Sequence, residues 1–201
     1  MTEILVLFYS RYGATAELAR RVARGIEGVD GATARLRTVP PVAPATEVAL
    51  PPVPESGPMY AEPRDLADCA GLVLGSPVRF GSMAAPLKVF FDQTSAMWIS
   101  GVLAGKPGGV FTSGQAMHGG QESTLLSMML PLLHHGMVVA GVPFTEKAIN
   151  DTRSGGTPYG ASHVAGRETQ PRLSDDERAV AQALGRRIAR LALAIGGAGP
   201  I

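Results

Sequence analysis

The sequence predicts a doubly wound α/β domain, in which a five-stranded parallel sheet carries helices on both faces. Short apolar runs recur along the chain, each ends in a turn rich in glycine and serine, and most of these turns lead into a segment with helical spacing. Strands buried on both faces read as continuous apolar runs, and their alternation with helices is typical of parallel sheets.

The first strand and helix are expected within the first 26 residues. Residues 4–8 are an apolar run, which predicts a strand. Residues 14–26 carry apolar side chains such as Leu18 and Ile26 at helical spacing, with arginines on the other side. The second strand is expected over residues 33–39.

The same pattern returns three times further along the chain. Strands are expected over residues 70–74, 109–111 and 137–140, and helices over 84–92 and 121–134. Ser174 and Glu177 form a capping box that opens a final helix towards Ile195.

The length of 201 residues fits a single domain spanning residues 1–201. Residues 40–63 contain eight prolines and little periodicity, which indicates a Pro-rich surface insertion. Residues 150–170 are expected to form a second irregular segment.

Composition excludes several classes of protein. The net charge is +1, without the basic stripe that nucleic-acid binding requires. The single cysteine, Cys69, lies beside an apolar run and is expected to be a small buried hydrophobe rather than half of a disulfide. The opening residues lack a secretory signal, and no apolar run is long enough to span a bilayer. The sequence therefore favours a cytoplasmic protein that needs no metal.

Ligands of parallel sheets bind beyond the carboxyl ends of the strands. Residues 10–15 follow the first strand and offer hydroxyl and backbone N–H groups at a helix N-terminus, which suits a phosphate. They lack the patterns of a P-loop or of a Rossmann dinucleotide site, so a phosphomonoester is favoured. A plain helix cap, with Ser10 as the N-cap residue, is the structural alternative.

Two further loops, residues 75–82 and 112–120, each follow an apolar strand and are rich in glycine and polar residues. Loops of this kind present backbone donors and acceptors. They suit a flat heteroaromatic ring that carries the redox chemistry itself.

The chain resembles the WrbA flavoproteins, the type IV NAD(P)H:quinone oxidoreductases, which have a flavodoxin-like fold. Six motifs in order carry the resemblance over nearly the whole chain: Tyr9-Ser10-x-Tyr12-Gly13, residues 75–81 (GSPVRFG), 91–94 (FDQT), 118–122 (HGGQE), 134–137 (HHGM) and 155–160 (GGTPYG). The resemblance implies the strand order 2-1-3-4-5 and a homotetramer with active sites near subunit contacts.

The resemblance also implies the site residues. Those expected to bind FMN are Ser10, Arg11, Tyr12, Gly13, Ala14, Thr15, Val78, Arg79, Phe80, Ser113, Gly114, Gln115, Ala116, Met117, His118, Gly119 and His134. Trp98 is expected beside the exposed flavin face, where quinone and nicotinamide bind in turn, and Tyr12 near the dinucleotide. From the residues alone, His135 can equally be a structural histidine, and Trp98 a core or interface residue. The family often has threonine where this chain has Val78.

The expected activity is reduction of quinones by NADH or NADPH through FMN, in a ping-pong sequence. No catalytic acid or base is assigned, because the flavin and solvent can supply the protons. The alternatives are an electron-transfer flavodoxin and a regulatory accessory protein. Neither a strongly charged docking face nor a helix-turn-helix signal supports them.

Overall fold

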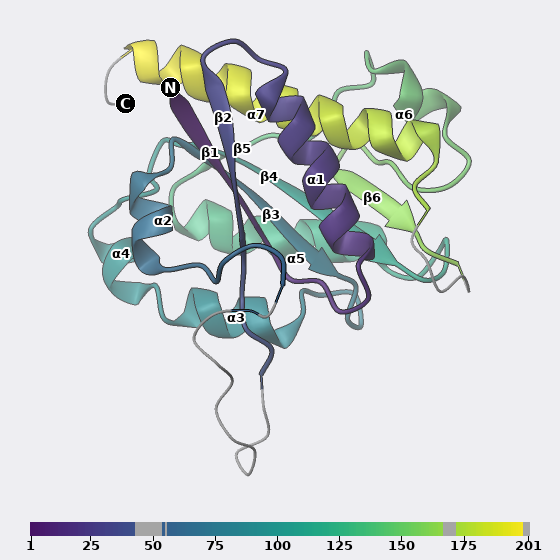
Figure 1. Cartoon of the computed structure of the whole chain (residues 1–201), viewed down its shortest axis with the longest axis horizontal. Helices are drawn as coiled ribbons and strands as arrows, with labels where there is room; N and C mark the ends of the chain where they lie inside the picture. The colour runs from purple at the N-terminus through teal and green to yellow at the C-terminus, as the bar shows by residue number, and fades with distance from the viewer. Residues whose placement is uncertain (43–53, 55, 167–171, 199–201) are drawn as a thin grey trace.

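The computed structural model describes residues 1–42, 54, 56–166 and 172–198, and its centre is a parallel sheet (Figure 1). The strands are β1 Thr2–Phe8, β2 Ala32–Thr38, β3 Gly71–Pro77, β4 Pro107–Gly114, β5 Val138–Val139 and β6 Ala161–Val164. The helices are α1 Ala14–Glu27, α2 Pro63–Asp68, α3 Ala85–Asp92, α4 Ser95–Ile99, α5 Gln121–His134, α6 Lys147–Asp151 and α7 Asp175–Ala198.

The sheet has the predicted order β2-β1-β3-β4-β5, with the additional strand β6 paired to β4. β5 pairs with Pro107 and Gly108 at the start of β4, whereas β6 pairs with residues 111–114 at its end. Because β3 occupies the other side of β4, β5 and β6 lie on the same side. The fifth position of the sheet is therefore filled by two short strands, separated by residues 140–160.

The expectation that residues 150–170 are wholly irregular is wrong for residues 161–164. These four residues contain Ser162 and His163, so no apolar run marks them as a strand. Pairing with β4 and the hydrogen bond between His163 and Glu177 of α7 stabilise this strand, although its composition does not favour one.

The Pro-rich surface insertion expected over residues 40–63 lies largely outside the described residues, which omit 43–53 and 55. Its later part returns to the sheet, because Thr38 and Tyr60 form a parallel bridge. α2 then begins with a capping box between Glu62 and Asp65.

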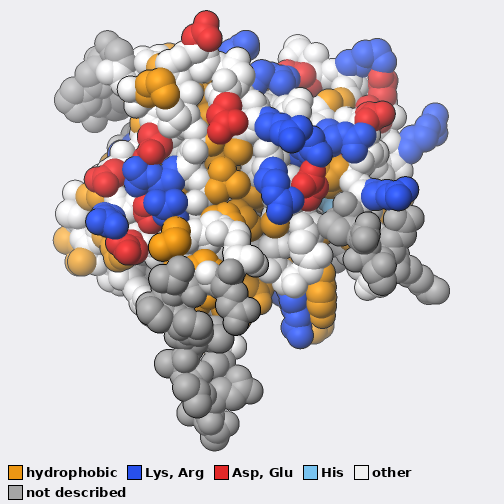
Figure 2. Space-filling model, in the orientation of Figure 1, with side chains coloured by type: hydrophobic (Ala, Val, Ile, Leu, Met, Phe, Trp, Pro, Cys, Tyr) orange, Lys and Arg blue, Asp and Glu red, His pale blue; other side chains and the backbone are white. Residues whose placement is uncertain are grey.

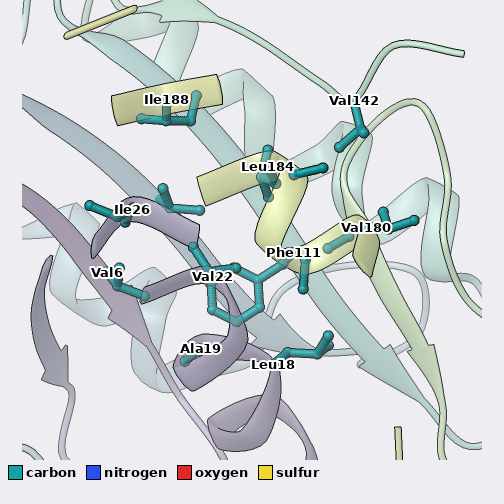
Figure 3. Packing of buried hydrophobic residues seen from close by; sticks show 14 of the residues in the cluster. Val6, Leu18, Ala19, Val22, Ile26, Phe111, Val142, Val180, Leu184 and Ile188 are labelled. Atoms are coloured by element: carbon teal, nitrogen blue, oxygen red, sulfur yellow. The ribbon is translucent and has the colours of Figure 1, made fainter. Parts of the chain in front are cut away.

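Two apolar cores lie on opposite faces of the sheet. On one face, Ile4, Val6 and Phe8 of β1 pack with α1 and α7 around Phe111, as Figure 3 shows for Val6 and Phe111. On the other face, Leu5 and Leu7 pack with α2, α3 and α5. Side chains on a strand alternate between faces, so the continuous apolar run of β1 supplies both cores.

Two glycines permit close packing within the first of these cores. A Cβ atom on Gly25 of α1 would lie 2.0 Å from the carbonyl oxygen of Gln182 on α7, so the two helix backbones nearly touch there. A Cβ atom on Gly75 of β3 would lie 2.0 Å from the ring of Phe111. Any larger residue at either position must displace a neighbour.

The surface over α1 and α7 is charged, with basic and acidic side chains interspersed (Figure 2).

Cys69 is 1% exposed, as predicted, and burial is the main cause that raises its pKa to about 11. Within the described ranges, no helix is long and apolar enough to cross a membrane.

Candidate functional site

Three loops meet at the carboxyl edge of the sheet, because β1, β3 and β4 are adjacent and parallel. The loops are residues 9–13, 78–84 and 115–120. The N–H of Val78 donates to the carbonyl oxygen of Ser113 at 2.9 Å, and the N–H of Tyr9 donates to that of Gly75 at 3.0 Å. Backbone hydrogen bonds therefore tie the start of each of the first two loops to the end of the neighbouring strand.

Two of these loops begin later than predicted. Residues 75–77 and 112–114, expected in loops, are the last residues of β3 and β4, and pair with one another from Gly75 with Phe111 to Pro77 with Ser113. Glycine and proline weaken a strand signal in the sequence. Here the neighbouring strands supply the missing stabilisation, and the glycine makes room for Phe111.

The first loop prepares an anion site at the start of α1. The N-cap residue of α1 is Gly13, with φ 92°, so the alternative of Ser10 as N-cap is not what the structure has. Ser10 Oγ nevertheless accepts hydrogen bonds from the N–H groups of Gly13 and Ala16, both at 3.2 Å. The N–H groups of Ala14 and Thr15 lie in the first turn, where no helical acceptor exists. Together with the helix dipole they favour a bound anion.

The second loop turns sharply and exposes an aromatic ring. Arg79 and Ser82 exchange backbone hydrogen bonds at 3.0 Å, and Phe80 between them has φ 52°. A positive φ is strained for a bulky residue, and such strain often marks a functional position. The Phe80 side chain is fully exposed, whereas Val78 and Arg79 are half-buried.

The third loop is closed by a side chain that the predicted site did not include. Gln121, the first residue of α5, is 6% exposed. Its Nε2 donates to the carbonyl oxygen of Ala116 at 2.6 Å, and its Oε1 accepts from the N–H of Gly119 at 3.1 Å. Gln115, Ala116, Met117, His118 and Gly119 are exposed around this clamp. A glutamine directly after two glycines is the sequence signal that could have identified it.

Glu177 stabilises β6, next to the end of β4, through hydrogen bonds. The sequence predicted this residue only as part of a helix cap. The Ser174–Glu177 capping box is confirmed. The same carboxylate also accepts from the N–H groups of Gly155 and Val164, at 2.9 and 3.0 Å, and from His163 Nδ1 at 2.9 Å.

Through Glu177, α7 fixes β6 against the end of β4. Beyond β6, the N–H groups of Ala165 and Gly166 donate to the carbonyl oxygens of Gly114 and Gln115, at 2.8 and 2.9 Å. Burial alone would raise the pKa of Glu177, but the hydrogen bonds from His163 and from the backbone outweigh it and lower the pKa to about 2. Glu177 is therefore ionised and bound to four donors.

Trp98 and His134 lie outside the three loops, in a groove that Ser82 and Met83 of the second loop also line. They line an open groove of about 680 Å³ between α3, α4 and α5, together with apolar residues such as Phe91 and Leu130. The indole Nε1 of Trp98 donates to the carbonyl oxygen of His134 at 2.7 Å, and the side chain is 52% exposed. Trp98 is therefore not a core residue.

The length of α5 separates this groove from the third loop. His134 ends the helix that Gln121 begins, so the two lie about 20 Å apart along its axis. Figure 1 shows α4 at the left and the ends of β3 and β4 at the lower right. Within one chain, the predicted site residues thus form two groups, one at the loops and one in the groove.

His135 has a structural role. It is 8% exposed, and its Nε2 lies 3.0 Å from Thr94 Oγ1. Since that hydroxyl donates its proton to the carbonyl oxygen of Phe91, His135 Nε2 is the donor. Burial, and secondarily the charge of His134, lower the pKa of His135. Among the residues described, no cluster of His, Cys, Asp or Glu could hold a metal ion.

Comparison with known proteins agrees with this geometry. The family model for NADPH-dependent FMN reductase matches residues 3–148. A protein of Chromohalobacter salexigens named NAD(P)H dehydrogenase (quinone) is 41% identical over 98% of this chain and 100% of its own length. A protein of the same name from Syntrophobacter fumaroxidans is 42% identical over 94% of this chain and 97% of its own.

Solved structures share the fold at lower identity. A WrbA-like flavodoxin of Agrobacterium tumefaciens has a TM-score of 0.66 at 22% identity, covering 96% of this chain and 99% of its own. Flavodoxin 1 of Bacillus cereus has a TM-score of 0.61 at 14% identity, covering 94% and 98%. The resemblance to the WrbA flavoproteins is thereby confirmed, and the chain belongs to the NADPH-dependent FMN reductase family, with a flavodoxin-like fold.

Proposed function

We propose that this protein is an FMN-dependent oxidoreductase that reduces quinones with NADH or NADPH. The observation that carries the proposal is that three loops meet at the carboxyl ends of the adjacent strands β1, β3 and β4. Their backbone N–H and carbonyl groups lie at the same edge of the sheet. The names of the full-length relatives at 41 and 42% identity support the same reaction.

The residues at this edge fit the parts of FMN in order. The backbone of residues 10–15 would hold the phosphate, because the first turn of α1 offers unpaired N–H groups and Ser10 Oγ fixes the loop around them. Val78, Arg79 and Phe80, with residues 113–119, would surround the ribityl chain and the ring. The Gln121 clamp keeps the third of these loops in shape before any ligand arrives.

FMN held by these residues would supply the redox chemistry, a two-electron transfer from NAD(P)H to a quinone. The chain's own contribution is to bind and orient the two substrates at one open face, which is why a ping-pong sequence is proposed. Exposed Tyr12 lies beside the phosphate loop, where the dinucleotide would pass. No carboxylate or histidine is assigned as a catalytic acid or base.

The position of Trp98 and His134 in the groove, away from the third loop, supports an assembly in which two copies share each site. In a homotetramer, the groove that Trp98 and His134 line would face the flavin edge of a neighbouring copy. Trp98 would then stack on a quinone or nicotinamide bound to that neighbour. Its orientation is already fixed by the hydrogen bond to the carbonyl oxygen of His134.

Exposed apolar side chains on α5 support this assembly. Leu126, Leu130 and Leu133 are 46, 59 and 55% exposed, and their spacing places them on one side of the helix. Phe80, at the flavin edge, is fully exposed as well. Apolar surfaces of this kind are typical of interfaces between subunits.

A cytoplasmic location is also proposed, in keeping with a free, buried cysteine.

The test is anaerobic reduction of the FMN-loaded protein by NADH or NADPH, followed through the flavin absorbance, and then reoxidation by benzoquinone. Rapid bleaching by the coenzyme and rapid return with the quinone are expected. A protein that binds FMN but reacts with neither coenzyme is an electron carrier, and a protein that binds no flavin refutes the proposal altogether.

A further inference from the structure

A second cavity, of about 390 Å³, lies beside the first loop. Ser10, Arg11 and Gly13 line it on one side, and Thr38 and Tyr60 on the other. β1 stands between β2 and β3 in the sheet, so this cavity, at the end of β2, lies on the opposite side of the loop from the flavin edge. None of the residues assigned to FMN at β3 or β4 reaches it.

The charge of this cavity comes from Arg11. The described residues that line it include no acidic side chain and no other cation. The guanidinium of Arg11 stacks over the exposed ring of Tyr12, with its Cζ atom 5.4 Å from the ring centre. The nearby Arg20 and Arg21 are paired with Glu17, whereas Arg11 forms no ion pair with any carboxylate in the described part of the chain.

We propose that Arg11 binds the 2′-phosphate of NADPH and makes the enzyme prefer NADPH to NADH. This inference rests on the proposed function, which brings the nicotinamide ring to the flavin edge. The other end of the dinucleotide then passes Tyr12 at the tip of the loop and reaches the cavity at the end of β2. There the ring of Tyr60 is available to the adenosine.

The chemistry of arginine favours this ligand. Its planar fork of donors matches a phosphate dianion, and an arginine without a carboxylate partner is free to bind one. NADH lacks the 2′-phosphate, so it gains nothing from Arg11. The FMN phosphate has its own donors, the backbone N–H groups of Ala14 and Thr15 in the first turn of α1.

The kinetic test compares wild type with Arg11→Gln and Arg11→Lys, all loaded with FMN. Arg11→Gln is expected to lower the ratio of kcat/KM for NADPH to kcat/KM for NADH at least tenfold. Arg11→Lys keeps the charge but loses the fork, so an intermediate loss is expected. Arg24→Gln, which removes one exposed arginine from the far end of α1, is the control for net charge and should leave the ratio unchanged.

A binding test does not depend on turnover. Calorimetric titration of the FMN-loaded protein with adenosine 2′,5′-bisphosphate and with 5′-AMP is expected to show at least tenfold tighter binding of the bisphosphate in wild type, and equal binding in Arg11→Gln. If wild type oxidises neither coenzyme but still shows this difference, the proposed function fails and the Arg11 site stands.

Three results would overturn the inference while leaving the proposed function intact. An unchanged NADPH-to-NADH ratio in Arg11→Gln means that the side chain meets neither coenzyme. An equal loss for both coenzymes means that it binds their shared pyrophosphate. A weaker FMN affinity with an unchanged ratio means that it holds the flavin phosphate.

Discussion

Replacing Glu177 with glutamine tests how the edge of the site is held. The side chain is 1% exposed, and its two oxygens accept four hydrogen bonds of 2.8 to 3.0 Å, from His163 Nδ1 and three backbone N–H groups. Glutamine has nearly the same shape but replaces one of these oxygens with a donor. It therefore sets donor against donor at one side of the cluster and removes the negative charge.

The size of the effect follows from the pKa. The folded value of about 2 compares with an ordinary value of 4.5. Each pH unit between the two corresponds to about 1.4 kcal/mol, so ionised Glu177 contributes about 3 kcal/mol to the free energy of unfolding at pH 7. Because the folded pKa is the lower one, this contribution is complete above pH 4.5 and is lost as the pH falls towards 2. About half of it is gone at pH 3.

The assay is urea unfolding followed by circular dichroism, at one protein and one FMN concentration, between pH 7 and pH 3. Glu177→Gln is expected to be less stable than wild type by about 3 kcal/mol at pH 7 and by about half as much at pH 3. Glu27→Gln, at an exposed position on α1, is the matched control and should change stability by no more than about 0.5 kcal/mol. A loss below about 1 kcal/mol at pH 7, or one that does not vary with pH, would show that the hydrogen-bond cluster does not stabilise the ionised form.

Three further outcomes are expected. FMN should bind more tightly than FAD in fluorescence titrations, because the phosphate loop over residues 10–15 closes on a terminal phosphate; equal affinities would contradict the placement of the phosphate there. Trp98→Ala should lower kcat/KM for quinone and NADH by a few-fold to about tenfold, with little change in FMN affinity. The control Ile99→Ala, at a neighbouring position that is 78% exposed, should change neither quantity. If Trp98→Ala loses FMN or fails to fold but its flavin-loaded fraction has normal kinetics, Trp98 is a structural residue. Gly75→Ala should destabilise the protein by about 1–3 kcal/mol in urea unfolding, because the new methyl group meets the Phe111 ring; a neutral result would mean that the ring moves freely.

The residue pattern was sufficient to place the first five strands and the helices α1, α3, α5 and α7, and the resemblance supplied the strand order. Each strand of the inner sheet is buried on both faces and so is apolar at consecutive positions, as in Ile4 to Phe8. The ends of β3 and β4 were missed because their last residues include glycine, serine and proline. These residues enter the sheet through pairing with each other, which no local pattern shows. β6 was missed for the same reason, since two of its four residues are polar.

The loops of the candidate site were predicted, but the residues that hold them were not. A loop after an apolar strand is visible in the sequence, and its ligand preference follows from glycines and hydroxyls. Gln121 and Glu177 act on backbone groups of other segments: Gln121 on the third loop, and Glu177 on β6 and the Gly155 turn. The hydrogen bonds of Glu177 depend on the tertiary structure and leave no local sign, whereas Gln121 directly after two glycines was a local signal that had not been used. The separation of His134 from the third loop was itself predictable, because the expected helix over residues 121–134 already sets it at about 20 Å along the helix axis.

The division of the site between loops and groove links flavin binding to assembly. If Trp98 and His134 of one copy complete the flavin site of another, FMN binds the assembled protein more tightly than the single chain. Thermodynamic reciprocity then requires FMN to strengthen assembly by the same factor. Flavin affinity should therefore rise with protein concentration, and light scattering should show larger particles when FMN is added to dilute protein. Leu130→Glu places a charge on the exposed apolar side of α5 and should abolish both effects while the single chain still binds FMN weakly. A wild-type monomer that binds FMN with one affinity at every protein concentration would show that a single chain holds the whole flavin site.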